Sequence, residues 1–181
     1  TKLWESHQSE MQADLTRHDA ILRESIEKYE GCVFKTMGDA FCSVFYTATQ
    51  AVQAALEGQQ VLQSESWRIP QNLRVRMALH AGEAQARDDD YFGTAVNRVA
   101  RLLSTAHGGQ ILLSAAVKEL VKDGLPKGLN LLSLGTHRLK DLSEPQPVFQ
   151  LKHPGLIADF PSLVTLDNRP NNLRPQPTSL I

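Results

Sequence analysis

Hydrophobic residues alternate strictly with polar or small residues over positions 72–80. One face of this segment would carry Leu73, Val75, Met77 and Leu79. The other face would carry Arg74, Arg76, Ala78 and His80. A period of two is typical of a half-buried β-strand, so we expect the apolar face to pack against helices. We interpret the histidine at the end of this strand as structural.

Two short β-prone runs within residues 33–45 are joined by Thr36-Met37-Gly38. Apolar runs on both sides of a glycine-containing turn predict a β-hairpin. Gly38 can take the positive φ that a tight turn needs. Lys35 and Asp39 are therefore expected beside the turn, one at the end of each strand.

Four segments have apolar residues at the spacing of three or four that is typical of amphipathic helices. They cover residues 4–30, 48–64, 94–106 and 115–123. Thr47 and Ser114 precede two of these helices, where a hydroxyl can cap the free backbone N–H groups. The core stripe of the third helix is expected to consist of Val96, Val99, Ala100 and Leu103.

Further strands are predicted at residues 83–87, 110–113, 129–142 and 147–152. The order of the predicted elements suits an α+β fold in which helices cover a largely antiparallel sheet. From residue 153 onward the periodicity ends, and five of the nine prolines fall in this last part of the chain. We therefore expect one domain over residues 1–152 and an extended linker over residues 153–181.

Composition narrows the class of protein. The chain has 181 residues, 41% of them hydrophobic, and a formal net charge of −1. This suits a packed domain without direct nucleic-acid binding, although a local basic cluster stays open. No apolar run approaches the roughly 20 residues that span a bilayer, and no signal peptide is apparent. We therefore expect a cytoplasmic protein without membrane contact.

The two cysteines, Cys32 and Cys42, lie at similar distances from the predicted turn. A symmetric hairpin register would place them opposite each other, where a disulfide is geometrically feasible. Two reduced and buried thiols are the alternative, which a reducing compartment favours.

Polar residues at three places suggest chemistry. Lys35 and Asp39 form either an exposed ion pair on an ordinary hairpin or part of a nucleotide site that holds Mg²⁺ and reads a base or phosphate. Asp90 ends an acidic run and precedes an aromatic, glycine-containing turn that could fix it. Asn97 and Arg101 are four residues apart and share a helix face, so they either bind a sugar and a phosphate or simply face solvent.

Two motifs taken together resemble the catalytic domain of the class III adenylyl and guanylyl cyclases. The first is Phe-Lys-Thr-Met-Gly-Asp-Ala-Phe at residues 34–41, and the second is Asp-Tyr-Phe-Gly-Thr-Ala-Val-Asn-Arg-Val-Ala-Arg at residues 90–101. The segments His-Gly-Gly-Gln-Ile-Leu-Leu-Ser and Gly-Thr-His-Arg-Leu-Lys-Asp-Leu are also similar to that family. The resemblance covers about residues 1–152 and implies the ferredoxin-like nucleotidyl cyclase fold.

The resemblance implies an enzyme that converts ATP to cyclic AMP and pyrophosphate, or GTP to cyclic GMP, with two Mg²⁺ or Mn²⁺ ions. It also implies head-to-tail homodimers whose sites are built from both subunits. Asp39 matches the second of two metal-binding aspartates. Lys35 and Asp90 match the pair that reads the purine, and this combination of a lysine and a carboxylate implies ATP rather than GTP.

Three further positions match the family's machinery for the sugar and phosphates. Asn97 matches the residue that orients the ribose. Arg101 matches the residue that stabilises charge on the α-phosphate during the reaction. Lys140 corresponds more loosely to a basic phosphate contact. Such a site works by positioning and charge neutralisation rather than through a covalent nucleophile.

The family's first metal-binding aspartate lies on a strand before the first helix, and this sequence begins after that segment. We therefore expect the first strand to be missing here, and activity to be low unless it is supplied. The alternative function is a catalytically weak or inactive nucleotide-binding and dimerisation module. Residues 169–181 resemble the linker that joins a cyclase domain to a P-loop ATPase and a DNA-binding region in some bacterial regulators. No Walker motif occurs in this chain.

Overall fold

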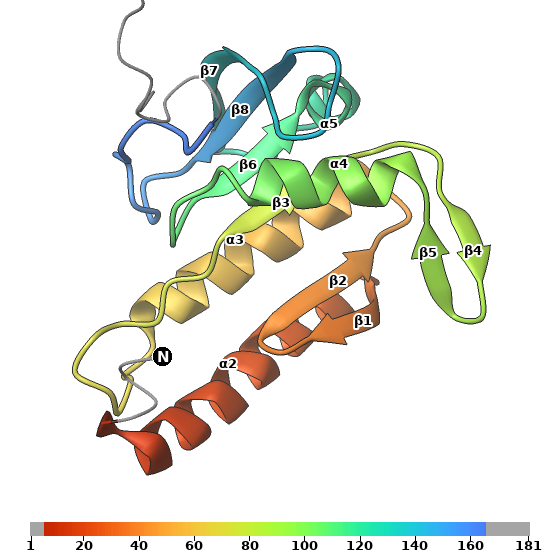
Figure 1. Cartoon of the computed structure of the whole chain (residues 1–181). Coiled ribbons are helices and arrows are strands. Elements are labelled where there is room, and N and C mark those ends of the chain that lie inside the picture. The colour runs from red at the N-terminus through yellow and green to blue at the C-terminus, as the bar shows by residue number, and fades with distance from the viewer. Residues whose placement is uncertain (1–5, 166–181) are drawn as a thin grey trace, which may run out of the picture.

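The computed structural model describes residues 6–165, which form helices packed around short strands (Figure 1). The helices are α2 (Gln8–Lys28), α3 (Ala48–Ser64), α4 (Thr94–Leu103) and α5 (Ala115–Val121). The strands are β1 (Cys32–Met37), β2 (Ala40–Val44), β3 (Met77–Leu79), β4 (Gln85–Arg87), β5 (Asp90–Phe92), β6 (Ile111–Ser114), β7 (Asn130–His137) and β8 (Gln146–Lys152). Within this part of the chain, no helix is long and apolar enough to cross a bilayer.

The strands form three separate sheets. The largest has the order β3-β6-β8-β7, in which β3 and β6 run parallel and the other two pairings are antiparallel. β1 pairs with β2, and β4 pairs with β5, both antiparallel. The predicted α+β architecture with largely antiparallel pairing is confirmed. The division into three sheets and the strand β5, which falls in a predicted turn, were not anticipated.

β3 is shorter than the alternating pattern at residues 72–80 predicts. The strand covers only Met77–Leu79, and the backbone before it is held by hydrogen bonds outside the regular strand pairing. The carbonyl oxygen of Val75 accepts hydrogen bonds from Gln59 Nε2 at 2.6 Å and from the Gly109 backbone N–H at 2.8 Å. These bonds fix the segment against α3 and the turn before β6, and they satisfy a carbonyl that a longer strand would have paired.

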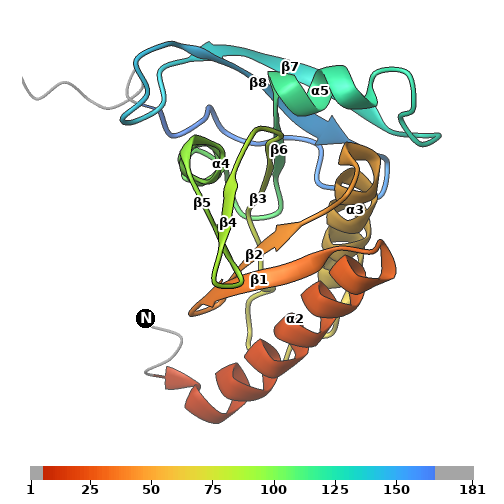
Figure 2. The same ribbon diagram turned by 90° about the vertical axis from the view of Figure 1, so that its right-hand side faces the viewer.

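Helices pack on both faces of the four-stranded sheet, with α4 on the opposite side of β6 from α3 (Figure 2). On β6, Ile111 and Leu113 belong to the core cluster that α3 and α5 complete. Leu112 belongs to a second cluster, which includes Leu102 of α4. Because β6 is covered on both faces, its apolar run is continuous rather than alternating.

α4 does not bury the stripe of residues predicted for it. Its buried residue is Leu102, which is 3% exposed. Val96 and Val99 are only half-buried, and Ala100 is exposed. The prediction was wrong because the helix contacts the sheet along the side that carries Leu102. The predicted apolar residues therefore form a partly exposed face of the domain.

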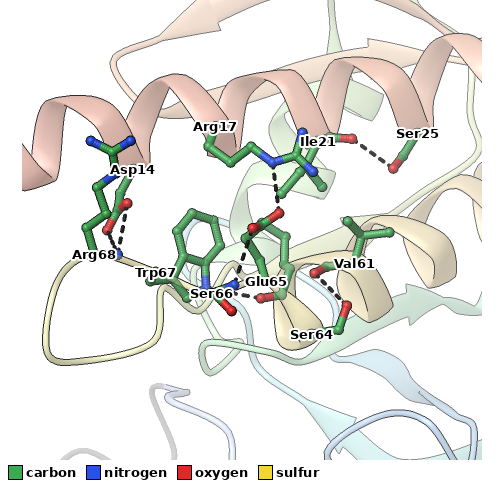
Figure 3. A network of polar contacts seen from close by, with 11 residues as sticks. Asp14, Arg17, Ile21, Ser25, Val61, Ser64, Glu65, Ser66, Trp67 and Arg68 are labelled. Carbon is green, nitrogen blue, oxygen red and sulfur yellow. Dashed lines mark hydrogen bonds and ion pairs between the residues drawn. The ribbon is translucent and has the colours of Figure 1, made fainter.

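α2 packs along α3 through an apolar cluster and is also joined to the segment after α3 by polar contacts (Figure 3). The buried carboxylate of Asp14 accepts hydrogen bonds from the backbone N–H groups of Arg68 and Ile69 at 2.9–3.1 Å. Arg17 forms an ion pair with Glu65 at 2.8 Å. These N–H groups offset the cost of burying the negative charge. Asp14 therefore holds the segment that follows α3 against α2.

The β1–β2 hairpin is confirmed, but its register is not symmetric. Lys35 pairs with Cys42, and Cys32 pairs with Val44, because the register shifts after Val33. The cysteines are therefore not opposite each other, and both are free thiols. The facing arrangement and the burial of Cys32 were wrong, since this residue is exposed.

The hairpin turn consists of Gly38 and Asp39. Gly38 has a φ of 63°, in the left-handed region that glycine enters without strain. Asp39 therefore lies in the turn itself rather than at the end of a strand, and it is exposed to solvent.

Residues 153–165 contain no helix or strand, but they pack against the domain. Leu156 and Leu163 are buried in the two main core clusters. The Val164 backbone N–H donates to the carbonyl oxygen of Thr105 at 3.1 Å. The packed body thus continues beyond residue 152. The role of residues 153–181 as a linker stays a prediction, and residues 166–181 lie outside the described part of the chain.

Candidate active site

The structure brings Lys35 and Asp90 together, although they are far apart in the sequence. Lys35 lies on β1 and Asp90 is the first residue of β5, and their side chains form an ion pair. Asp90 also accepts a hydrogen bond from the backbone N–H of Tyr91 at 2.8 Å. The Lys35 Nζ atom lies 5.7 Å from the centre of the Phe92 ring, within the range of a cation–π contact.

Aromatic packing beside the ion pair holds the two strands in place. The rings of Phe34 and Tyr91 meet edge to face, with 5.0 Å between their centres. Each ring is the immediate chain neighbour of one member of the ion pair. This geometry is favourable for aromatic pairs, so the hairpin and the β4–β5 ladder are joined at the point where the charged pair forms.

A tight turn determines where Asp90 begins its strand. The two residues between β4 and β5, Asp88 and Asp89, both have positive φ, at 51° and 60°. Two left-handed residues in a two-residue loop match the type I′ turn, for which aspartate is a suitable residue. Asp88 and Asp89 thus form the turn that directs Asp90 toward β1.

The pKa values of two groups are shifted at this point, one by hydrogen bonding and one by burial. The hydrogen bond from Lys35 lowers the pKa of Asp90 below its ordinary value of 3.8, and the Tyr91 backbone N–H acts in the same direction. Cys42, the cross-strand partner of Lys35, has a raised pKa because it is partly buried. Near neutral pH Asp90 is therefore a carboxylate, and the neighbouring Cys42 is a protonated thiol.

α4 begins directly after β5 because Gly93 makes the connection. Gly93 has a φ of 121° and a ψ of −169°, a region that is essentially restricted to glycine. Its carbonyl oxygen accepts from the Asn97 backbone N–H at 3.3 Å. The Asn97 side chain is exposed, one helical turn before Arg101 on the same side of the helix.

Arg101 makes a contact that the sequence did not predict. Its Nη2 atom lies 2.7 Å from Asp141 Oδ2. Asp141 follows Lys140 in an exposed turn after β7, so the structure also brings the predicted phosphate contact close to the end of α4. Nothing in the sequence singles out Asp141, because its role depends on a tertiary contact between distant segments.

Asp39 stays apart from the other candidate residues. It lies exposed at the tip of the hairpin, and residues 6–165 contain no cluster of three or more His, Cys, Asp or Glu side chains that could hold a metal ion. Mg²⁺ in phosphate sites is usually held by one or two carboxylates together with substrate oxygens. Asp39 can supply one such ligand, so the described residues fit a complete two-metal site only if other carboxylates join them.

His80 has a structural environment. Its Nδ1 atom lies 2.9 Å from the hydroxyl of Ser114, the residue that caps α5. Burial lowers the pKa of His80, and the nearby charge of Arg98 adds to this effect. The neutral imidazole is therefore favoured, in keeping with the structural interpretation.

Comparison with known proteins identifies the family. The sequence profile of the adenylate and guanylate cyclase catalytic domain matches residues 1–152. An uncharacterized protein of Mycobacterium tuberculosis is 37% identical over 177 residues, which is 97% of this chain and 60% of that protein. The adenylate cyclase of Mycosarcoma maydis is 33% identical over 148 residues, which covers 68% of this chain and 6% of that enzyme. The chain belongs to the adenylate and guanylate cyclase catalytic domain family.

Solved structures show the same fold. Adenylate cyclase from Trypanosoma brucei, described in its monomeric state, matches with a TM-score of 0.78 and 26% identity, covering 90% of this chain and 87% of that one. An adenylate/guanylate cyclase/hydrolase from Silicibacter pomeroyi matches with a TM-score of 0.72 and 26% identity, covering 88% of this chain and 90% of that one. The fold is therefore the nucleotidyl cyclase fold. The chain spans about 60% of the length of the mycobacterial relatives that it matches.

Proposed function

We propose that this chain is an adenylate cyclase domain that converts ATP to 3′,5′-cyclic AMP and pyrophosphate. The observation that supports this most strongly is the ion pair between Lys35 and Asp90. An ammonium group and a carboxylate side by side offer one donor and one acceptor. Adenine presents the complementary edge, an acceptor at N1 and an amine donor at N6, whereas guanine has an acceptor oxygen in place of that amine.

The reaction requires the ribose 3′-hydroxyl to attack the α-phosphorus in line with the leaving pyrophosphate. A bond from O3′ to phosphorus forms, the bond from phosphorus to the bridging oxygen of the β-phosphate breaks, and the hydroxyl proton is lost. In this proposal Asn97 orients the ribose and Arg101 stabilises the charge that develops on the α-phosphate. Lys140 contributes a further positive charge toward the phosphates. Positioned charges of this kind supply much of the catalysis in phosphoryl chemistry.

We propose that Asp39 is one ligand of a Mg²⁺ or Mn²⁺ ion. When bound, such an ion neutralises phosphate charge and activates the attacking oxygen. The support is the chemistry of an exposed carboxylate at a glycine turn. Since the described residues supply only this carboxylate, no catalytic step is derived through the metal. In the family pattern the first metal-binding aspartate lies on a strand upstream of the first helix, and Asp39 takes the place of the second.

The proposed site is shared by two subunits arranged head to tail. Lys35, Asp90, Asn97 and Arg101 lie along β1 and the continuous β5–α4 segment of one subunit. Within residues 6–165, Asp39 makes no hydrogen bond or ion pair with any of them. The half-buried apolar face of α4 offers surface for a second copy. In a two-fold dimer each surface occurs twice, so two equivalent composite sites would form.

The proposal is tested by measuring cyclic AMP from ATP, and cyclic GMP from GTP, with Mn²⁺ and with Mg²⁺. We expect cyclic AMP as the main product from a version of the chain that also carries the upstream strand of the family pattern, at concentrations where the protein is dimeric. Arg101→Ala should lower kcat/KM by about 10²- to 10³-fold. Arg76→Ala, which removes an exposed arginine outside the site, should leave the rate unchanged. No product from the dimeric, extended version would reject the proposal.

The second candidate is a catalytically weak or inactive module that binds nucleotide and dimerises. It is favoured by the single carboxylate at the predicted metal position in the described residues. This function predicts ATP binding or self-association by the chain without turnover. Cyclic AMP formation by the chain as given, abolished by Asp39→Ala, would exclude it.

We also propose a setting for the chain. Residues 153–181 would lead to further domains in a parent protein, of the ATPase and DNA-binding kind found in some bacterial regulators, and the protein would act in the cytoplasm. The support is the resemblance of residues 169–181 to such linkers and the greater length of the mycobacterial relatives. The sequence of the parent gene on both sides of this chain tests the proposal directly.

A further inference from the structure

The arginine that the proposed site needs for phosphate already has an anionic partner in the protein. Arg101 Nη2 lies 2.7 Å from Asp141 Oδ2, and the two side chains are 39% and 57% exposed. A nucleotide arriving from solvent can therefore reach both groups. Because guanidinium binds carboxylate and phosphate with the same donor geometry, the two anions compete for Arg101.

The position of Asp141 is set by the backbone rather than by the ion pair. Asp141 has a φ of 60°, in the left-handed region. Just before it, Leu139 is 3% exposed and belongs to the same buried cluster as Leu102, the residue after Arg101. The Leu142 backbone N–H donates to the carbonyl oxygen of Leu139 at 3.3 Å and closes the turn. The backbone of this turn is thus held beside the end of α4, where the Asp141 carboxylate reaches Arg101.

The side chains at the end of α4 would attract a polyanion once Asp141 no longer contacts Arg101. Lys140 is exposed and makes no hydrogen bond or ion pair within residues 6–165. A phosphate at the end of α4 would meet the positive charges of Arg101 and Lys140 and the negative charge of Asp141. Asp141 is therefore the one group of the three that opposes phosphate binding.

We propose that Asp141 is a resident counter-ion of Arg101 which the triphosphate of the nucleotide displaces on binding. The inference rests on the proposed function, because it takes Arg101 as the phosphate ligand. Exposed ion pairs contribute only about 0.2–1 kcal/mol, so breaking the contact between Arg101 and Asp141 costs little. This energy corresponds to a change of roughly 1.5- to 5-fold in the affinity for the nucleotide. Asp141 thereby tunes the affinity for substrate without touching the reacting atoms.

Asp141→Asn tests this with little change in shape. Asparagine tolerates the left-handed conformation as aspartate does, and only the charge is lost. We expect KM for ATP to fall by about 1.5- to 5-fold while kcat stays the same, because ground-state and transition-state binding improve together. The difference should shrink in 1 M salt, where exposed charges are screened.

Two comparisons separate this role from a general change in net charge. Glu119→Gln removes the same charge from another exposed, ion-paired acid, on α5, and should leave KM unchanged. In the background of Arg101→Ala, the effect of Asp141→Asn should become smaller, because Asp141 then has no arginine for which to compete with phosphate. A raised KM, a lowered kcat, or an undiminished gain in the Arg101→Ala background would each overturn the proposal.

Direct binding of inorganic triphosphate, measured by calorimetry, separates this inference from the proposed function. If the wild type makes no cyclic AMP but Asp141→Asn tightens triphosphate binding by about 1.5- to 5-fold, the counter-ion role stands and the adenylate cyclase function fails. If the wild type is active and Asp141→Asn changes neither KM nor triphosphate binding, the counter-ion role fails and the function stands.

Discussion

At the scale of residues, two ion pairs involve candidate site residues, and only one of them could be expected from the sequence. The pair of Lys35 and Asp90 could be expected, because each residue lies in a motif that resembles the cyclase family. The pair of Arg101 and Asp141 could not, because neither spacing nor composition relates residues from α4 and from the turn after β7. Contacts between distant surface segments depend on packing that local patterns do not encode.

The pKa of Asp90 tests whether the first pair exists in solution. Lys35 holds this pKa below 3.8, and Lys35→Met, which keeps much of the length and removes the charge, should return it toward the ordinary value. Carboxyl NMR titration of both proteins measures the difference. Equal pKa values in the two proteins would show that the ammonium group and the carboxylate are not in contact.

The sign of the accompanying pH dependence follows from the same shift. A carboxyl group with a lowered pKa in the folded state binds fewer protons there than in the unfolded chain at acidic pH. Its contribution to stability is therefore present above the unfolded pKa and is lost as the pH falls through the lowered folded value. Lys35→Met should remove this contribution. The free energy of unfolding of the variant should therefore fall less steeply than that of the wild type as the pH is lowered through this range.

At the scale of elements, the helices and the hairpin follow from local chemistry. α3 begins at the predicted residue because Thr47 and Gln50 form a reciprocal capping box. The register of the hairpin and the buried side of α4 were not predictable in the same way. An irregularity at β1 shifts the cysteines apart, and the direction in which α4 meets the sheet decides which apolar residues are buried.

The connection after α3 gives a stability prediction. Asp14→Ala leaves the backbone N–H groups of Arg68 and Ile69 without their acceptor. Buried groups that lose their partner typically cost about 1–3 kcal/mol, so the free energy of unfolding should fall by that amount in urea denaturation. Glu24→Ala, at an exposed position of the same helix, should change it by less than about 0.5 kcal/mol. Equal effects of the two substitutions would show that the contact in Figure 3 does not stabilise the fold.

At the scale of the whole molecule, the residues proposed for nucleotide binding follow one another along the described chain, apart from the proposed metal ligand. They run from the hairpin along β5 and α4 to the turn at Lys140, and the proposed metal ligand is Asp39 at the hairpin tip. The family and the fold could be predicted from the motifs and the order of elements. The surface proposed for a second copy could not be predicted in this way, because it is a property of the folded domain.

The central claim is that groups from two copies of this chain complete one nucleotide site. The most direct test mixes Asp39→Ala with Arg101→Ala, both in the version that carries the upstream strand, and each is expected to be nearly inactive alone. In an equal mixture half of the dimers contain one of each variant, and each such dimer has one intact site, so about a quarter of the wild-type rate of cyclic AMP formation should return. A mixture no more active than the average of the two variants would contradict the account.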